Sequence, residues 1–432
     1  MSGYAEFLAS KQRAAPVAGR PCAESDVHPM LHPWQRRITA WAVRRGRAAL
    51  WEDTGLGKTL QQAEWARLSA DRALIVAPLA VCQQTVREAA KIGITARYAR
   101  SDDQARGDGI WVTNYEMAAR FDPAGLGAVV LDEASILKQS DGKTRTMLIR
   151  HFAPVPRRLT ATATPAPNDM EELTNQAEFL GVASRTEMLA AYFVHDDDGW
   201  RLKGHARKPM FAWMASWAAA VSRPSDIGGS DEGYLLPGLD IIPHLLAVDI
   251  VPDDQLFATS LGGVGGRARI RRATLDARCE AAAKLVTDEP DEPWLLWTGL
   301  NAEADRLADL LPGAVNVHGS MSPEEKAEAF LAFADGSIRH VITKSSIAAF
   351  GLNWQHCARM TFVGLGDSYE QYYQAIRRCY RYGQRRRVHA HIVLSELEGQ
   401  ITANVARKEA QAAAVSRELV REMRAAGELE ER

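Results

Sequence analysis

Short apolar runs alternate with longer amphipathic stretches along most of the chain, and this alternation limits the possible folds more than any other feature. Several of the runs are uninterrupted, which is typical of strands that are buried on both faces of a parallel sheet. The helical stretches between them indicate βαβ units. The first series of expected strands comprises Ala48–Trp51, Ala73–Ala77, Ile110–Thr113, Ala128–Leu131 and Arg157–Thr160.

The pattern changes after about residue 180 and then resumes. Residues 181–222 have a helical pattern, and the charge-free stretch Pro209–Ser222 favours a buried helix. Residues 224–243 are rich in Gly, Pro, Asp and Ser, the composition of a linker. The core candidates of the helical part are Met188, Leu189, Tyr192, Phe193, Phe211, Met214 and Trp217. The second series of expected strands is Trp294–Trp297, Ala314–Val317, His340–Thr343, Met360–Val363 and His389–Leu394.

The sequence therefore predicts an α/β protein with two lobes that each contain a parallel sheet, joined by a helical connector and a linker. We expect an N-terminal extension at 1–27, the first lobe at 28–180 and the connector with its linker at 181–243. The second lobe is expected at 244–400, and an exposed C-terminal helix at 401–432 because alanines alternate with charged residues there.

Charge and cysteine usage exclude several classes of protein. The net charge of −2 is unlike that of a protein that coats nucleic acid, so any such binding must use local patches, of which Arg377–Arg387 is the densest. The five scattered cysteines include no Cys-x-x-Cys pair, which favours reduced thiols over a disulfide framework or a zinc site. Without a signal peptide or a bilayer-spanning stretch, we expect a cytoplasmic protein with no membrane partner.

A glycine-rich loop follows the first expected strand and opens a helix, which is the setting of a phosphate-binding loop. Gly55 and Gly57 would let backbone N–H groups face a phosphate, Lys58 would neutralise the β- and γ-phosphates of ATP, and Thr59 would hold Mg²⁺. Glu52 stands where the strict pattern has its first glycine. The alternative is a glycine-rich turn followed by a chance Lys-Thr.

Two carboxylates end the fourth expected strand. Asp132 is placed to hold Mg²⁺, and Glu133 to orient and deprotonate an attacking water. An Asp-Glu pair at a strand end could also cap the next helix. Its position about 75 residues after the Lys-Thr pair suits the intervening βα units of one lobe.

Together these segments resemble superfamily 2 helicases, specifically the Swi/Snf-like branch in its compact bacterial or phage form, which also tolerates an acidic residue at the position of Glu52. The similarity covers about residues 30–395 and includes, in the order of the family, segments similar to its Gln motif, motifs I, Ia, Ib, II and III, a hinge, and motifs IVa, V and VI. The corresponding segments begin at Leu31, Asp53, Ala77, Thr113, Asp132, Thr162, Ser222, His318, Phe350 and Gln374. Ser135 replaces a common His, and Arg377 a common acidic residue.

The resemblance implies two RecA-like lobes and a role for each matching residue. ATP would be bound by Gln35, which would read the adenine edge, and by Thr54, Gly55, Leu56, Gly57, Lys58 and Thr59. Mg²⁺ would be held by Thr59 and Asp132. Glu133, Lys58 and the arginines Arg378 and Arg381, spaced i, i+3 on an expected helix, would be catalytic. Coupling and nucleic-acid contact would fall to Pro78, Asn114, Thr162, Thr164, Gly351, Asn353 and Gln374.

Other polar and aromatic residues have competing interpretations. Arg385–Arg387 are equally consistent with a solvated helix end and with phosphate contacts, whereas the run of Arg267, Arg269, Arg271 and Arg272 favours a surface helix face over DNA contact. Trp34, Trp213 and Trp217 favour core packing over base stacking. His318 favours a structural role over metal binding.

Three functions follow from these residues. The first is a monomeric motor that moves along double-stranded DNA by ATP hydrolysis in the cytoplasm of a bacterial cell or a phage-infected host. The second is a helicase that separates strands or migrates branches on single-stranded or branched DNA, for which the sequence offers no obvious strand-separating pin. The third is a non-catalytic DNA-binding protein on a motor fold. The sequence does not indicate which proteins this chain binds.

Overall fold

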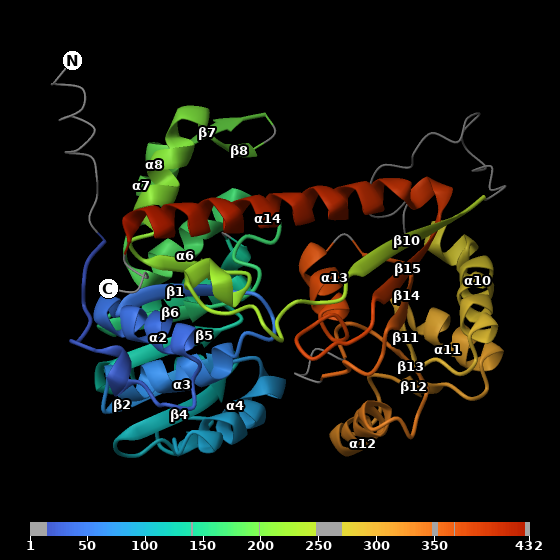
Figure 1. Cartoon of the computed structure of the whole chain (residues 1–432), viewed down its shortest axis with the longest axis horizontal. Helices are drawn as coiled ribbons and strands as arrows, with labels where there is room; N and C mark the ends of the chain where they lie inside the picture. Colours follow the sequence, from blue (N-terminus) through green and yellow to red (C-terminus); the bar gives the residue numbers. More distant parts are fainter. Residues whose placement is uncertain are drawn as a thin grey trace. The chain divides into compact units, whose positions relative to one another are not determined.

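The computed structural model describes residues 15–139, 141–197, 199–247, 270–347, 353–366 and 368–427, and the chain divides into two compact units. Lobe 1 comprises the residues up to 232 together with those from 410 on, and lobe 2 comprises residues 233–409. Each lobe has a parallel sheet with helices packed against it (Figure 1). The predicted α/β fold with two parallel sheets is confirmed.

The lobe 1 sheet has seven strands in the order β3-β4-β2-β5-β6-β1-β9, and every neighbouring pair is parallel. All five predicted strands are present and each is extended by at most two residues. The strands are β1 (Arg47–Glu52), β2 (Arg72–Ala77), β3 (Ala96–Tyr98), β4 (Gly109–Asn114), β5 (Ala128–Asp132), β6 (Arg157–Ala161) and β9 (Ala218–Val221).

Helices connect these strands and begin or end at residues suited to those positions. The helix α2 (Pro33–Arg45) has Pro33 at its first position and is capped by Gly46, whose φ of 68° is the left-handed conformation of a glycine cap. The other helices of this part of lobe 1 are α3 (Lys58–Ser69), α4 (Leu79–Lys91), α5 (Lys143–His151), α6 (Leu173–Leu180), α7 (Arg185–Tyr192) and α8 (Arg207–Met214).

The prediction of one buried helix at Pro209–Ser222 is wrong in its second half. The helix α8 ends at Met214, and Ala218–Val221 form β9, which is fully buried beside β1. Pairing with β1 outweighs the helix propensity of the three alanines, as tertiary context commonly does. The expected core residues are buried, except that Tyr192 is half-buried and stacks on Trp213.

The connector also contains an antiparallel hairpin that the helical prediction missed. Its strands are β7 (Phe193–Asp196) and β8 (Gly199–Leu202). His195 and Trp200 face each other across the hairpin with their rings edge to face, and Trp200 is 38% exposed.

The C-terminal helix α14 (Gly399–Ala426) was expected to be exposed, and from Ala410 on this is wrong. One face of this part of the helix is buried in lobe 1, with Leu419 fully covered and Met423 Sδ accepting a hydrogen bond from the Ala220 N–H of β9. On the same part of the helix Glu418 pairs with Arg207, and Arg424 donates to the Asp226 carbonyl. The buried residues Val415, Leu419, Val420 and Met423 recur at helical spacing, and the surrounding alanines and charges obscured this pattern.

The lobe 2 sheet has six parallel strands in the order β10-β15-β14-β11-β13-β12. The end of the predicted linker is wrong, because Leu239–Leu246 form β10 and pair with β15 over eight residues. The other strands are β11 (Trp294–Thr298), β12 (Val315–Val317), β13 (His340–Thr343), β14 (Arg359–Val363) and β15 (Val388–Ser395). The helices are α10 (Leu275–Asp288), α11 (Asn301–Leu310), α12 (Pro323–Ala334) and α13 (Tyr369–Ile376).

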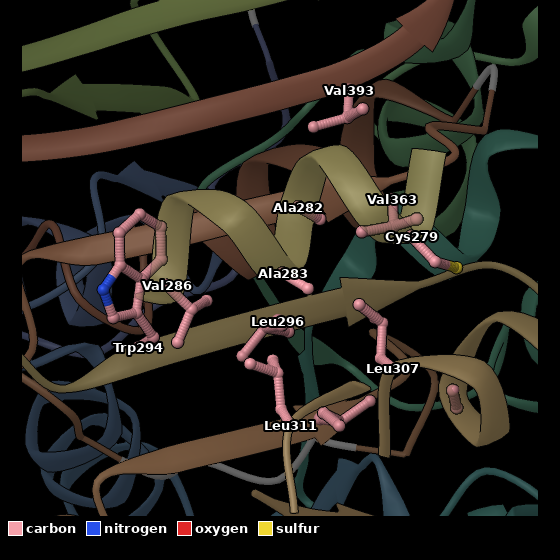
Figure 2. Packing of buried hydrophobic residues seen from close by; sticks show 12 residues of the cluster. Cys279, Ala282, Ala283, Val286, Trp294, Leu296, Leu307, Leu311, Val363 and Val393 are labelled. Carbon is pink, nitrogen blue, oxygen red and sulfur yellow. The ribbon is translucent and has the colours of Figure 1, made fainter. Parts of the chain in front are cut away.

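The core of lobe 2 forms where α10 and α11 pack on the sheet (Figure 2). Ala282 and Ala283 let α10 approach the strands closely, where Leu296 and Val363 are fully buried. Arg278 and Glu303 form an ion pair with both side chains fully buried, at 2.7 Å between Nη1 and Oε1.

The structure also bears on the cysteines and on membrane association. All five cysteines are free and buried. Among the described residues, no helix combines the length and apolar character needed to cross a membrane.

Replacing Leu419 should show how much α14 contributes to lobe 1. Leu419→Ala leaves a cavity at a fully buried position, so we expect the free energy of unfolding to fall by about 2–4 kcal/mol. Urea unfolding followed by tryptophan fluorescence measures this loss. Arg417→Ala, at an exposed position of the same helix, should change stability little. Equal effects of the two substitutions would contradict the docking of this helix.

Candidate active site

Four segments of lobe 1 end at one edge of its sheet. The loop Asp53–Gly57 follows β1, Asp132 ends β5, Thr162 follows β6 and Pro78 follows β2. These strands are neighbours and run parallel, so their carboxyl ends meet at the same edge, where open α/β sheets bind ligands. The sheet thereby brings together residues that are far apart in the sequence.

The loop after β1 has the backbone that only glycine adopts at low cost. Gly55 and Gly57 have φ values of 89° and 81°. A Cβ added at Gly57 would lie 2.4 Å from Gln35 Nε2, so a side chain at this position would displace the Gln35 amide. Leu56 is buried and anchors the loop, and the Thr54 N–H donates to Asp53 Oδ1 at 2.6 Å.

Gln35 fastens this loop to the start of α2. Its Oε1 accepts from the His32 N–H at 2.9 Å, and its Nε2 donates to the Leu56 carbonyl at 2.8 Å. The side chain is buried. The adenine contact predicted for Gln35 stays a prediction, and the amide already has a role in holding the loop.

Lys58 begins α3 and folds back onto the loop. Its Nζ donates to the carbonyl oxygens of Glu52 at 2.7 Å and Asp53 at 3.0 Å. Charged phosphate oxygens are stronger acceptors than carbonyl groups, and the N-terminus of α3 adds a partial positive charge next to them. The loop therefore has the donors that a triphosphate needs.

Glu52, where the strict pattern has glycine, is fully buried at the end of β1. Its Oε2 accepts from Gln61 Nε2 at 2.8 Å. Burial raises the pKa of Glu52 to about 7, against the lowering effects of the Lys58 charge and the Gln61 hydrogen bond. This carboxyl group is therefore a buried, titratable group at the end of β1 and not a ligand exposed to solvent.

Asp132 faces the same lysine from β5. Its Oδ1 accepts from Gln62 Nε2 at 2.8 Å, and its carbonyl accepts from the Tyr115 hydroxyl. Burial raises the pKa of Asp132, opposed by Gln62 and Lys58. A buried carboxylate is stabilised by a cation, and carboxylate and hydroxyl oxygens such as those of Asp132 and Thr59 are ligands that Mg²⁺ prefers.

A complete metal cage is not what phosphate-binding loops provide. No group of three or more His, Cys, Asp or Glu side chains is placed to hold a metal within the described ranges. Magnesium sites of this kind use one or two protein ligands and complete the shell with phosphate oxygens and water. The residues present therefore fit Mg²⁺ bound together with a nucleotide.

Glu133 is the only non-glycine residue with a positive φ in the described part of the chain, at φ 56° and ψ 55°. Such backbone strain costs on the order of 1–3 kcal/mol and is concentrated at functional sites. Glu133 Oε2 accepts from the Thr162 hydroxyl at 3.4 Å, and that hydroxyl accepts from the Thr164 N–H at 3.1 Å. The acidic pair is thus linked to the segment after β6, and the Ser135 hydroxyl donates to the Glu133 carbonyl at 3.4 Å.

In lobe 2, the helical placement of Arg378 and Arg381 is wrong. The helix α13 ends at Ile376, and both arginines lie in the turns that follow. The Trp354 N–H donates to the Arg378 carbonyl at 2.9 Å, and Gln384 Nε2 donates to the carbonyls of Cys357 and Cys379. These bonds end the helix and fix the turn that leads into β15.

Arg381 has a buried guanidinium nitrogen without a partner in the described part of the chain. Its Nε is buried and has no hydrogen-bond acceptor among the described residues. Burial lowers the pKa of Arg381 to about 10, with further lowering by Arg378 and Arg377. A buried donor without an acceptor costs about 1–3 kcal/mol, which an anion would relieve.

The residues expected to contact nucleic acid are placed less uniformly. Asn114 is buried and donates to Glu116, Pro78 is partly exposed at the start of α4, and Gln374 is half-buried on α13. Asn353 is exposed, and Gly351 lies outside the described residues.

The basic clusters are largely paired where they are described. Arg386 bonds to Glu292, Arg387 to Asp240 and Arg271 to Glu398. Arg267 and Arg269 lie outside the described residues. His318 bonds to Ser320 Oγ at 2.8 Å, and Trp34, Trp213 and Trp217 are buried, as expected for packing roles.

Sequence reasoning missed the polar residues that support the site. Gln62 lies four residues after Lys58, so helical spacing places it on the same face of α3, and this signal was available. Tyr115 and the strained backbone of Glu133 had no such signal.

Two family models match the chain, one in each lobe. A SNF2-related domain matches residues 34–192, and a helicase conserved C-terminal domain matches residues 279–383. A solved Sulfolobus solfataricus SWI2/SNF2 ATPase core in complex with dsDNA is similar at 18% identity, with a TM-score of 0.45, over 92% of this chain and 96% of that chain. No curated protein matches the sequence.

The pair of domains defines the class: the protein is a nucleic-acid-dependent ATPase of superfamily 2. Within that class the SNF2-related domain of lobe 1 is decisive. The chain belongs to the Swi/Snf-like branch of the superfamily 2 helicases.

The raised pKa of Glu52 predicts a pH-dependent stability. Between about pH 4.5 and 7 the folded state holds a proton that the unfolded state has lost, so stability should fall as pH rises through this window. Glu52→Gln removes this loss, and from pH 5 to 8 the wild type should lose about 1–3 kcal/mol more than the variant. Urea unfolding at each pH measures the difference, and parallel profiles would contradict it.

Proposed function

We propose that the protein is a monomeric, ATP-driven translocase on double-stranded DNA. Lys58, Thr59 and the amides of the loop Thr54–Gly57 bind the phosphates of ATP, and Gln35 reads the adenine edge. Thr59 and Asp132 hold Mg²⁺, which neutralises charge on the phosphates when bound. Glu133 orients the attacking water and accepts its proton.

The observation that carries the proposal is the buried Nε of Arg381, which lacks an acceptor among the described residues. A motor of this class needs a guanidinium group that meets the negative charge spreading over the transferred phosphoryl group. Arg378 lies three residues away and supplies a second positive charge. Because these arginines belong to lobe 2 and the loop to lobe 1, hydrolysis depends on lobe closure.

We infer that the coupling between the nucleotide site and the DNA-binding segments begins at Glu133. Its carboxylate bonds to Thr162, and Thr162 bonds to the backbone of Thr164. A change in the hydrogen bonds of Glu133 is therefore transmitted to the segment after β6. The track is contacted mainly at its phosphates, through the segments of Pro78, Asn114, Gly351, Asn353 and Gln374, which gives salt-sensitive binding with little base recognition.

A strand-separating helicase is the second candidate, and the β7–β8 hairpin favours it. The hairpin carries the exposed aromatic ring of Trp200, of the kind on which bases stack. Asp196 and Asp197 stand at its turn and disfavour approach of the phosphate backbone. Trp200→Ala should therefore leave duplex translocation unchanged. Loss of fork unwinding in that variant would support the helicase instead.

Substitution of the proposed catalytic residues tests the motor. We expect Lys58→Ala and Glu133→Gln to lower the ATPase rate by about 10²–10⁴-fold, and Arg381→Ala by about 10³–10⁵-fold with nucleotide binding retained. Arg386→Ala, in the same arginine run but paired with Glu292, is the matched control and should stay within a few-fold of wild type. A Lys58→Ala variant that behaves like the wild type in every assay, with no nucleic-acid-stimulated ATPase activity in either protein, would favour a non-catalytic DNA-binding protein.

The track is tested by the nucleic acid that stimulates hydrolysis. ATPase rates measured with duplex DNA, single-stranded DNA and RNA should be highest with the duplex and should fall steeply with salt. Stimulation by single-stranded DNA or RNA alone would overturn the duplex translocase.

Thr162→Val tests coupling separately from chemistry. It keeps the shape of the side chain but removes the hydroxyl between Glu133 and Thr164. We expect a modest loss of ATPase rate, about 10-fold or less, and a larger loss of DNA movement in a triplex-displacement assay. Equal losses in the two assays would contradict a coupling role.

A further inference from the structure

The pocket around Glu52 contains more acceptors than donors. Gln61 Nε2 donates hydrogen bonds to Glu52 Oε2 at 2.8 Å and to the Leu56 carbonyl at 3.2 Å. The remaining oxygens, Glu52 Oε1 and Gln61 Oε1, are both buried, and no described group donates to either of them. Adding one proton to Glu52 would supply a donor that this pocket lacks.

Lys58 is the charge that balances Glu52. Its ammonium group rests on the Glu52 carbonyl at 2.7 Å, and it favours the ionised form of the Glu52 carboxyl group. Neither strand beside β1 places a charged residue opposite Glu52: β9 has Val221 there, and β6 ends at Ala161, which lies opposite Leu50. Asp132, the other buried acid near Lys58, competes for the same ammonium group.

We propose that Glu52 takes up a proton when Lys58 leaves the loop carbonyls to bind the phosphates of ATP. This inference rests on the proposed function. Once the ammonium group turns to the phosphates, a buried carboxylate would remain without its counter-charge, and burial makes that state costly. One proton from the solvent bonds to the Glu52 carboxylate and no bond in the nucleotide breaks. The proton returns to the solvent when the nucleotide leaves and Lys58 folds back.

Glu52 is on this view a positioning residue, which acts through Lys58. It holds the lysine on the loop while the site is empty and releases it at the cost of a proton. Above about pH 7, where the empty site has an ionised Glu52, nucleotide affinity should fall by up to about 10-fold per pH unit. A glycine at this position, as in the strict phosphate-loop pattern, would remove this dependence.

Isothermal titration calorimetry measures the proton directly. The full-length chain is titrated with the Mg²⁺ complex of a non-hydrolysable ATP analogue, in two buffers that differ in ionisation enthalpy, at pH 8 and at pH 6. We expect uptake of about 0.5–1 proton per nucleotide at pH 8 and near zero at pH 6, where Glu52 already holds its proton. The wild type alone thus provides a test.

Two variants assign the proton to Glu52. In Glu52→Gln the proton uptake at pH 8 should disappear. Subtracting the uptake of the variant from that of the wild type removes the contribution of protons that the nucleotide itself exchanges. Glu64→Gln is the matched control: Glu64 is a fully buried glutamate of α3, bonded to Arg67 and the His28 N–H, and its loss should leave the uptake unchanged.

The failures are distinguishable. Nucleotide binding without proton uptake at pH 8, equal uptake at pH 6 and pH 8, or uptake that persists in Glu52→Gln overturns the inference and leaves the proposed function standing. Absence of any binding heat, together with absence of nucleotide protection against thermal unfolding, overturns the nucleotide site and the inference with it.

Discussion

The parallel pairing of β5, β6 and β1 is the constraint on which the site depends. In this ladder Asp132 lies opposite Ala161, and Ala161 lies opposite Leu50, so the three chain segments that follow emerge side by side. Lys58, Glu133 and Thr162 are separated in sequence by 75 and 29 residues, and this register brings them to one edge. A slip by one residue would turn each strand-end side chain to the other face of the sheet.

Burial then sets the chemistry of these groups. Two acids, Glu52 and Asp132, share the field of a single lysine, and desolvation raises the pKa of both. A site built in this way is short of positive charge when empty. The shortage is destabilising in the empty site. A metal ion that binds together with the nucleotide would supply the missing positive charge.

How much of this could be predicted from sequence depended on whether the signal was local. The ten strands that were predicted and the loop around Gly57 were recognisable because apolar runs bounded by turn residues and the strand–loop–helix order are local patterns. The strand Ala218–Val221 was not, because alanine favours helices and only its place beside β1 makes it a strand. The buried face of α14 and the turn that holds Arg378 and Arg381 also depend on contacts with distant segments. The strain at Glu133 has no sequence signal at all.

Buried polar atoms without a hydrogen-bond partner among the described residues occur in both lobes, and two of them, Glu52 Oε1 and Arg381 Nε, belong to residues of the proposed site. Lobe 1 has buried carboxyl oxygens short of a proton or a cation, and lobe 2 has the buried guanidinium Nε of Arg381 short of an acceptor. Both are costly in a folded protein. On the proposed function, the oxygens of a bound triphosphate would offer acceptors to guanidinium groups, and the proton taken up with the nucleotide would serve Glu52. On that proposal, the ligand that relieves these groups is also the one whose hydrolysis would drive the motor.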